Sequence, residues 1–209
     1  MSKIFVYGKY PHQNYQKAVK KAGFTLTMNP NEADCLLLGG GGDVAPCLYG
    51  GVGIIARDVD IERDVNELYL IRKFLDTKRY VFGICRGEQI INVYFGGTLY
   101  NTLSSRHAYR GRDRLHAATF KGMLKSVYGD AGIVNSAHRQ AVQKLGCSLK
   151  VSALSDDGEI EAIEGKNVLA VQFHPERTIS PAIDGTKLFS AFLALAEKKT
   201  IKNNPISSS

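Results

Sequence analysis

The sequence has little cysteine, with four residues in 209, and lacks the spacing that would make them a framework. The four, Cys35, Cys47, Cys85 and Cys147, are widely separated, and none stands in a Cys-x-x-Cys or Cys/His zinc-ligand pattern. Their spacing therefore argues against a disulfide scaffold and against a zinc site. It is typical of free thiols in a reducing compartment, and we expect a cytoplasmic protein.

Long hydrophobic runs are also absent from the sequence. No run approaches the roughly 18 apolar residues of a membrane span, so no membrane partner is expected. The N-terminus, "MSKIFVYGKY", enters a strand-like run at once and has no secretory h-region or cleavage site. No repeat or linker divides the chain, so we expect one domain over 1–200 and a flexible polar tail over 201–209.

Acidic residues are fewer than basic ones, 20 against 27, which gives a formal net charge of +7. Most of the lysines are scattered, which is typical of a solvated surface. One cluster stands out, made of Arg106, Arg110, Arg112 and Arg114. A solvated basic loop is the favoured interpretation, recognition of an anionic substrate group is the functional alternative, and a nucleic-acid partner is the weaker one. A homodimer is left open.

Short apolar strands alternate with amphipathic helical patterns through most of the chain. This order predicts an α/β fold, a three-layer sandwich with a central, mostly parallel sheet. Expected strands lie at 3–8, 24–28, 34–38, 80–84, 148–154, 159–164 and 167–173, and expected helices at 14–23, 60–78, 86–95 and 184–199. The expected helix over 60–78 shows the helical spacing i, i+4, i+7 at Ile61, Val65, Leu68, Arg72 and Leu75.

The stretch "YVFGICRGEQIINVYFGG" places Cys85 where a strand ends and a helix begins, between Gly83 and Gly87. A helix N-terminus favours the thiolate, and the free N–H of Arg86 could serve an oxyanion beside the sulfur. The glycines would keep side chains out of a tight turn. A packed structural cysteine and a nucleophile both remain open on spacing alone.

A base for that nucleophile is offered by "VLAVQFHPE". His174 ends an apolar strand, and Glu176 lies two positions later, on the same side of an extended chain, where its carboxylate could fix the imidazole tautomer. Pro175 between them stiffens the segment. A surface turn after an edge strand is the alternative, and it explains less because nucleophile, base and acid are then all present.

Four consecutive glycines in "LLLGGGGDVAPCLYGG" follow a buried strand and indicate a close backbone approach. A phosphate loop would continue with Gly-Lys-Ser/Thr, which this stretch lacks. A second oxyanion donor from the Gly40–Gly41 backbone fits better.

Together these motifs carry a family resemblance. "GICRGEQ" and "QFHPE" resemble the elbow and the His-x-Glu element of class I glutamine amidotransferase-like proteins, whose fold is flavodoxin-like. The gamma-glutamyl hydrolase branch, which includes the gamma-glutamyl-gamma-aminobutyrate hydrolases, is closer still. Its blocks have counterparts in order over about residues 34–176, namely "GGGDVAPCLYG" (40–50), "RDVNEL" (63–68), "VNSAHRQAV" (134–142) and "DGEIEAIE" (157–164).

The resemblance implies that Cys85 is the nucleophile, His174 the base and Glu176 its orienting acid. It implies oxyanion N–H groups from Gly41 and Arg86 and no metal or organic cofactor. Residues implied to line the substrate pocket are Gly40, Gln89, Asn135, Ser136, Ala137 and His138. The chain departs from the family in reading His138-Arg139 where two histidines are usual, and in being shorter than most gamma-glutamyl hydrolases.

We therefore expect a cysteine hydrolase that cleaves a small γ-glutamyl amide or isopeptide, releasing glutamate and an amine through a thioester. The first alternative is a glutaminase subunit that passes ammonia to a separate synthetase; no synthetase domain is present, and Arg86 after the cysteine favours the hydrolase. The second is a catalytically silent binding module, which the intact set of catalytic residue types disfavours.

Overall fold

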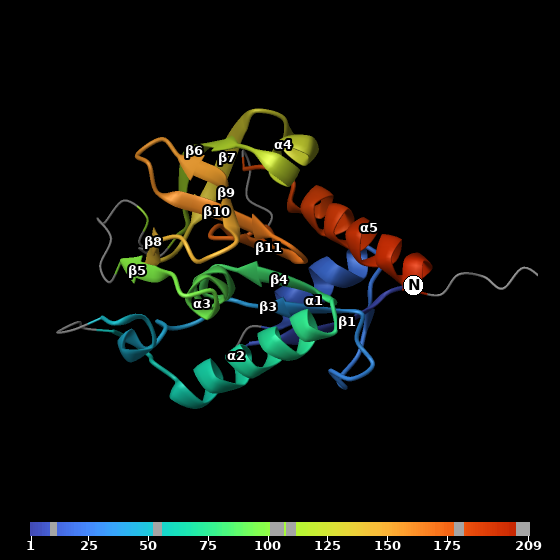
Figure 1. Cartoon of the computed structure of the whole chain (residues 1–209). Helices are drawn as coiled ribbons and strands as arrows, with labels where there is room; N and C mark the ends of the chain where they lie inside the picture. Colours follow the sequence, from blue (N-terminus) through green and yellow to red (C-terminus); the bar gives the residue numbers. More distant parts are fainter. Residues whose placement is uncertain (9–11, 52–55, 101–106, 108–111, 178–181, 204–209) are drawn as a thin grey trace, which may run out of the picture.

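The computed structural model describes residues 1–8, 12–51, 56–100, 107, 112–177 and 182–203. Within these ranges, nine strands form one sheet in the order β2-β1-β3-β4-β11-β10-β9-β6-β7 (Figure 1). The strands are β1 (Lys3–Tyr7), β2 (Thr25–Leu26), β3 (Cys35–Leu38), β4 (Tyr80–Ile84), β6 (Arg114–Phe120), β7 (Ala131–Ser136), β9 (Leu149–Ser155), β10 (Ile160–Gly165) and β11 (Val168–Val171). Two further strands, β5 (Thr98–Tyr100) and β8 (Ala141–Lys144), pair as a small antiparallel sheet.

The large sheet has two halves of different pairing. From β2 to β11, neighbouring strands are parallel, whereas from β11 to β7 they are antiparallel. Short turns join β9 to β10 and β10 to β11, and short turns can only connect antiparallel neighbours. The predicted α/β class with a central sheet is confirmed, and its parallel pairings lie in the first half.

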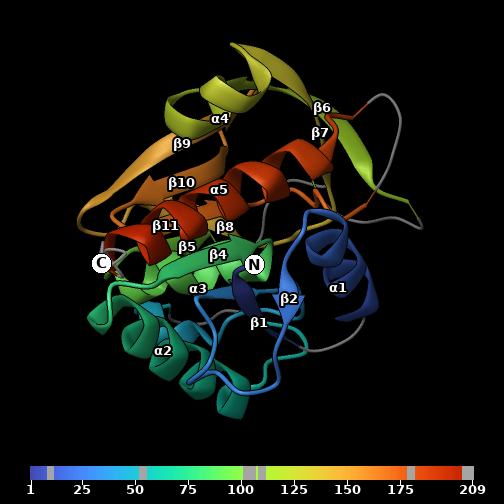
Figure 2. The same ribbon diagram turned by 90° about the vertical axis from the view of Figure 1, so that its right-hand side faces the viewer.

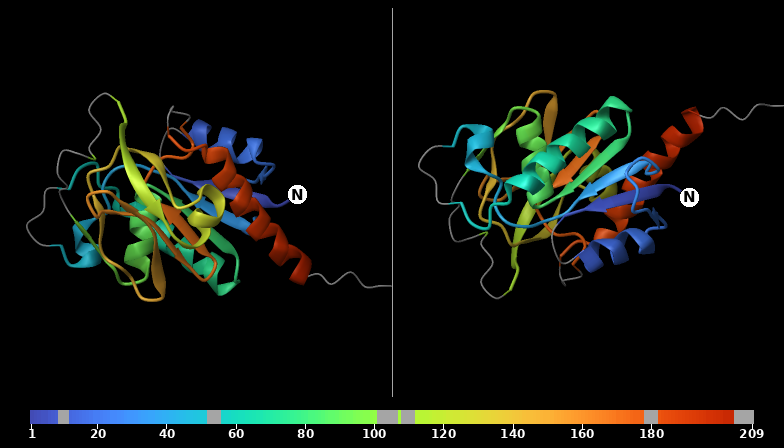
Figure 3. Two further views of the ribbon diagram at one scale, coloured as in Figure 1. Left: turned by 90° about the horizontal axis from the view of Figure 1, so that it is seen from above. Right: turned by 90° about the horizontal axis from the view of Figure 1, so that it is seen from below.

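Helices cover both faces of the sheet and make a three-layer arrangement. On one face lie α1 (His12–Lys21), α4 (Gly122–Tyr128) and α5 (Gly185–Asn203), and on the other lie α2 (Ile61–Asp76) and α3 (Arg86–Tyr94). Figure 2 shows α5 and α2 on opposite sides of β4. Figure 3 shows α1 beside α5, which agrees with the contacts between these helices.

Strand alternation divides the core between the two faces. Cys35 and Leu37 of β3 join the cluster under α1 and α5, and Leu36 and Leu38 join the cluster under α2 and α3. Successive strand residues point to opposite faces, so a strand covered on both sides is apolar throughout. The uniformly apolar run at 35–38 therefore marks a central strand, as its burial confirms.

Helix α2 is present as predicted, but of the residues at the apolar spacing only Leu68 and Leu75 pack against the core. Ile61 and Val65 are 54% and 57% exposed. The residues that face the protein are Arg63, Asp64, Glu67, Leu70, Ile71 and Phe74. Charged side chains lie inside because they pair with each other and with a buried arginine of α3, which compensates their desolvation.

The other predicted elements occur with small shifts at their ends. The 3-10 helix at Pro46–Tyr49 and the elements β6, α4, β7 and β8 were not in the predicted set. None of the helices in the described residues is long and apolar enough to cross a membrane.

Candidate active site

Three chain segments meet at the carboxyl ends of the central parallel strands. The glycines at 39–41 follow β3, Cys85 follows β4, and the segment with His174 follows β11. β3 and β11 flank β4 on either side, so these segments share one edge of the sheet. That edge is where open α/β sheets place their ligand sites.

Cys85 occupies a strained turn between β4 and α3. Its backbone has φ 56° and ψ −108°, in a region that side-chain-bearing residues rarely adopt. Its N–H donates to the Val171 carbonyl at 2.8 Å, and its own carbonyl accepts from the N–H groups of Glu88 and Gln89 at 3.0 and 3.3 Å. Strand pairing and the first helical turn thus hold the cysteine in this conformation.

The two flanking glycines are required by packing. A Cβ at Gly83 would lie 2.6 Å from the backbone of Gly87, and a Cβ at Gly87 would overlap the Leu38 carbonyl. The start of α3 therefore rests directly on β4 and β3. This close approach explains the spacing around Cys85, which a merely packed cysteine would not need.

His174 lies next to Cys85 and pairs with Glu176. Its Nδ1 is 2.8 Å from Glu176 Oε1, and its Nε2 has no hydrogen-bond partner among the described residues. Burial lowers the pKa of His174, but the charges of the Cys85 thiolate and Glu176 outweigh burial and raise that pKa to about 10. The imidazolium is therefore the favoured form of His174 at neutral pH.

Hydrogen bonds from the Asn135 side chain to the His174 backbone hold this segment in place. The Asn135 side-chain amide donates to the His174 carbonyl at 3.2 Å and accepts from the His174 N–H at 3.3 Å. Arg177 lies 3.5 Å from Glu176 and also pairs with Asp113 at 2.5 Å. The orientation of the imidazole is therefore fixed from several sides.

The glycine loop after β3 is oriented by Tyr15 and Arg63. The Gly40 N–H donates to the Tyr15 hydroxyl at 2.9 Å, and Arg63 Nη2 donates to the carbonyls of Gly39 and Gly40 at 2.9 and 3.0 Å. The Gly40 carbonyl and the Gly41 N–H belong to one trans peptide and point in opposite directions. Arg63 therefore turns the Gly41 N–H away from itself, and that N–H donates to no acceptor in the described part of the chain.

A buried ion network supports both sides of this arrangement. The Arg86 guanidinium, 1% exposed, pairs with Asp64 and Glu67 of α2, and Glu67 also accepts from Arg63 Nε at 2.7 Å. Asp64 accepts the Ala45 N–H at 3.1 Å. The network ties α2, the start of α3 and the glycine loop together, so the N–H groups of Gly41 and Arg86 keep a fixed relation.

A pocket of about 240 Å³ opens beside Cys85. Its wall carries both signs of charge, with Arg57 and Arg139 on one hand and Asp43 and Asp58 on the other. The Nε of Arg139 is buried and has no hydrogen-bond partner among the described residues. The remaining lining residues are Gly41, Gly42, Gln89, Ala137, His138 and Gln140.

The predicted site residues are thus divided by the structure. Gly41, Gln89, Ala137 and His138 line the pocket. Gly40 lies behind Cys85, where a Cβ would sit 3.6 Å from Cys85 Cβ and 3.4 Å from His174 Cε1.

Asn135 and Ser136 differ from the prediction, because neither lines the pocket. They lie at the end of β7, where Asn135 bonds the His174 backbone and Ser136 Oγ lies 3.1 Å from His116 Nδ1. Arg139, Asp43, Arg57 and Asp58 were missed. Arg139 follows the predicted His138 directly, and its position was the departure noted from the family pattern.

A second polar cluster was also missed. His107, His116 and His138 surround Glu161 of β10, and all four side chains are buried. Burial alone would raise the pKa of Glu161, but His116 and His138 lower it to about 2. The members come from four distant segments, so no local spacing in the sequence could reveal the cluster. Of the arginine cluster, Arg106 and Arg110 lie outside the described residues, Arg112 is exposed and Arg114 begins β6.

With the fold and the site described, comparison with known proteins gives the family. The peptidase C26 family model matches residues 6–176. The chain belongs to this family, which is class I glutamine amidotransferase-like, and membership supports an enzyme.

Relatives agree with this assignment. The chain is 37% identical over 203 residues to PB2B2.05 of Schizosaccharomyces pombe, a protein provisionally named a glutamine amidotransferase, covering 87% of this chain and 80% of that one. It is 29% identical to the gamma-glutamyl-gamma-aminobutyrate hydrolase PuuD of Escherichia coli, covering 79% and 74%. The crystal structure of a glutamine amidotransferase from Thermotoga maritima shares the fold with a TM-score of 0.65 at 16% identity, covering 96% of this chain and 86% of that one.

Proposed function

We propose that the protein is a cysteine hydrolase that cleaves a γ-glutamyl amide or isopeptide bond and releases glutamate and an amine. The observation that carries the proposal is Cys85 in a strained strand-to-helix turn beside the His174–Glu176 pair. The names of relatives such as PuuD support the substrate class.

The first half of the reaction forms a thioester. The Cys85 thiolate attacks the γ-carbonyl carbon, and the N–H groups of Gly41 and Arg86 stabilise the oxyanion of the tetrahedral intermediate. The His174 imidazolium donates its Nε2 proton to the departing nitrogen as the C–N bond breaks. The raised pKa of His174 keeps that proton available at neutral pH.

The second half hydrolyses the thioester. Neutral His174 takes a proton from water, and the resulting hydroxide attacks the same carbon within the same oxyanion hole. The C–S bond breaks, glutamate leaves, and the thiolate and imidazolium are restored. Glu176 keeps Nδ1 protonated through both steps, so that Nε2 is the atom that exchanges the proton.

The pocket suits the head group of a glutamyl substrate. A glutamyl α-carboxylate would find the unpartnered Nε of Arg139, and its α-ammonium would find Asp43 or Asp58. The volume of about 240 Å³ suits a small head group. The free cysteines, two of them exposed, suit a reducing cytoplasm, where we place the reaction.

The test is a screen of the purified protein against γ-glutamyl amines and free glutamine, with glutamate, amine and ammonia all measured. We expect glutamate and amine in equal amounts from at least one γ-glutamyl amine, with no second protein present. Hydrolysis of glutamine alone, and only after a synthetase is added, would replace the proposal with the ammonia-donating alternative. No turnover of either substrate class would remove both.

A further inference from the structure

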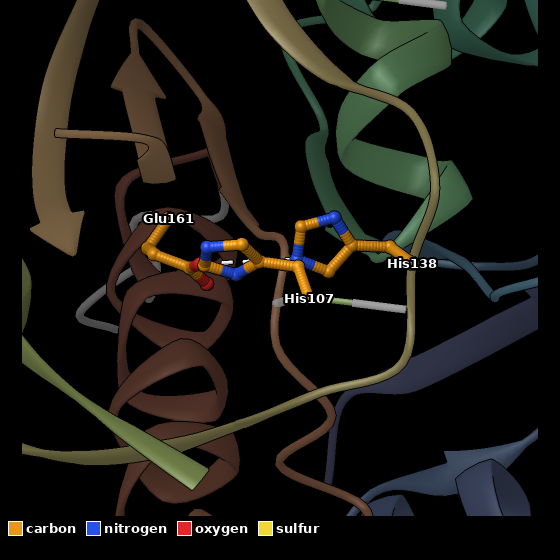
Figure 4. Close-up of side chains that lie close together, drawn as sticks. All are labelled: His107, His138 and Glu161. Atoms are coloured by element: carbon orange, nitrogen blue, oxygen red, sulfur yellow. Dashed lines mark ion pairs between the residues drawn. The ribbon is translucent and has the colours of Figure 1, made fainter. Parts of the chain in front are cut away.

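The histidine cluster lies apart from the chemistry at Cys85 and has the features of a metal centre. His107, His138 and Glu161 offer one ligand atom each, and the three atoms lie within 4.8 Å of one another (Figure 4). From these residues we propose that the protein binds one divalent transition-metal ion, of the class that takes zinc, between His107 Nδ1, His138 Nε2 and the Glu161 carboxylate.

Distances among the ligand atoms are close to those of a bound ion. His107 Nδ1 is 3.6 Å and His138 Nε2 is 3.8 Å from Glu161 Oε1. Two ligands of a tetrahedral zinc ion with bonds near 2.1 Å lie about 3.4 Å apart. Both histidine-to-glutamate distances are therefore within a few tenths of an ångström of those in a zinc site, and the whole set of atoms lies within 4.8 Å. Closing of the two histidines around the ion would complete three protein ligands, with the fourth position open to water or substrate.

Both histidines are held by their other ring nitrogen, as metal-binding histidines are. His138 Nδ1 lies 3.1 Å from the Gln140 carbonyl, which can only accept, so Nδ1 carries the proton and Nε2 faces Glu161 with its lone pair. His107 Nε2 lies 2.9 Å from the Asp157 carboxylate, which leaves its Nδ1 as the lone-pair atom. Such outer partners fix the tautomer and raise ligand basicity.

The cluster also has acceptor atoms without donors. His138 Nε2 and Glu161 Oε2 are buried without a hydrogen-bond partner among the described residues. Unpartnered buried acceptors are unfavourable, and a cation satisfies several of them at once. Only nitrogen and oxygen ligands are present, a borderline set that suits zinc better than calcium or magnesium.

The position of the site gives the ion a consequence for the pocket. His138 lines the pocket beside Cys85, whereas Glu161 belongs to β10 in the antiparallel half of the sheet. An ion between them would tie the pocket wall to that half and to His107.

The test uses the Cys85→Ala protein, because a thiolate beside His174 could itself take the metal. After chelation, the protein is titrated with Co²⁺, and bound metal is counted by mass spectrometry of the element while the visible spectrum reports the ligands. We expect one equivalent per chain, tetrahedral d–d bands, no thiolate charge-transfer band, and a thermal midpoint that rises with metal concentration.

Further substitutions in the Cys85→Ala protein show which residues bind the metal. Glu161→Gln and His107→Asn should weaken Co²⁺ binding at least about 100-fold, and Asp157→Asn, which removes an outer partner, about 10- to 100-fold. His174→Asn is the matched control, a buried histidine paired with a carboxylate elsewhere, and should leave binding unchanged.

Anomalous diffraction from a Zn²⁺-soaked Cys85→Ala crystal locates the ion even if a variant fails to fold. A peak between His138 and Glu161 supports the site. Less than one equivalent bound at micromolar metal, equal binding by a folded Glu161→Gln protein, or a peak at His174 or a surface cysteine would overturn it.

Discussion

Beneath the glycine loop, beside the parallel half of the sheet, the buried charges are guanidinium groups paired with carboxylates, whereas in the antiparallel half imidazoles surround one carboxylate. Arg63 and Arg86 face Asp64 and Glu67 beneath the glycine loop, and neither arginine can lose its proton at any ordinary pH. The rings around Glu161 can lose theirs, or bind a metal. The first arrangement suits a fixed scaffold for an oxyanion, and the second suits a site that responds to its conditions.

The sharpest way to break this comparison is to remove the nucleophile. Cys85→Ala should lower the turnover rate by about 10⁴- to 10⁶-fold, because the thioester route is lost, while the circular dichroism spectrum stays unchanged. Glutamate release from a γ-glutamyl amine measures it. Cys147→Ser, at an exposed thiol, is the matched control and should retain full activity. Residual turnover above a hundredth of the wild-type rate would move the chemistry away from Cys85.

The next largest effect is a loss of stability when the buried ion network around Arg86 is broken. Arg86→Met should lower the free energy of unfolding by about 3–5 kcal/mol, since it leaves the Asp64 and Glu67 carboxylates buried with less compensation. Urea unfolding measures the loss. The exposed i,i+4 pair of Arg72 with Asp76 provides the control, and Arg72→Met should change stability by no more than about 0.5 kcal/mol.

Urea unfolding of a variant in the histidine cluster around Glu161 sharpens the comparison with Arg86→Met. Glu161→Gln in chelator should lower the free energy of unfolding less than Arg86→Met does, by about 1–3 kcal/mol, because it leaves imidazoles that can stay neutral. Equal losses for the two variants would show that the antiparallel cluster is charged as permanently as the parallel one.

The pKa values of two buried histidines should be shifted in opposite directions. Charges of the Cys85 thiolate and Glu176 overcome burial and raise the pKa of His174 to about 10, whereas burial lowers the pKa of His138. Nitrogen NMR of the metal-free protein at pH 7.5 should show His174 protonated and His138 neutral. In Cys85→Ala the pKa of His174 should fall, because the thiolate charge is gone. The same protonation state for both rings would contradict this.

The raised pKa of His174 also makes the stability of the fold depend on pH. A folded-state pKa above the unfolded value of about 6.5 adds stability below that pH, and the contribution is lost as the pH rises toward 10. The wild-type protein should therefore lose more stability than Cys85→Ala between about pH 6.5 and 10. Urea midpoints of both proteins are measured across this pH range. An equal loss in the two proteins would show that the thiolate does not raise the pKa of His174.

The parallel half of the sheet and its site can be predicted from the sequence better than the antiparallel half, for a physical reason. Glu176 lies two residues from His174 and Arg86 follows Cys85 directly, and uniformly apolar strands such as 35–38 mark the parallel core, so local patterns suffice there. The apolar spacing in α2 does not reveal its inward face, because that face also carries Arg63 and Glu67, whose burial depends on a partner in α3. The cluster around Glu161 depends on strand pairing between distant segments, which no local period encodes.

The smallest expected effect concerns the basic segment before β6, where exposed Arg112 and half-buried Arg114 belong to the predicted arginine cluster. If these arginines recognise an anionic leaving group, Arg112→Gln with Arg114→Gln should raise KM for an anionic γ-glutamyl amine about two- to five-fold, the range of exposed ion pairs. The rise should shrink with added salt, because screening already weakens the contact. A neutral γ-glutamyl amide is the matched control, and its KM should not change. Equal effects on both substrates, or none on either, would leave the segment as solvated surface and confine recognition to the pocket beside Cys85.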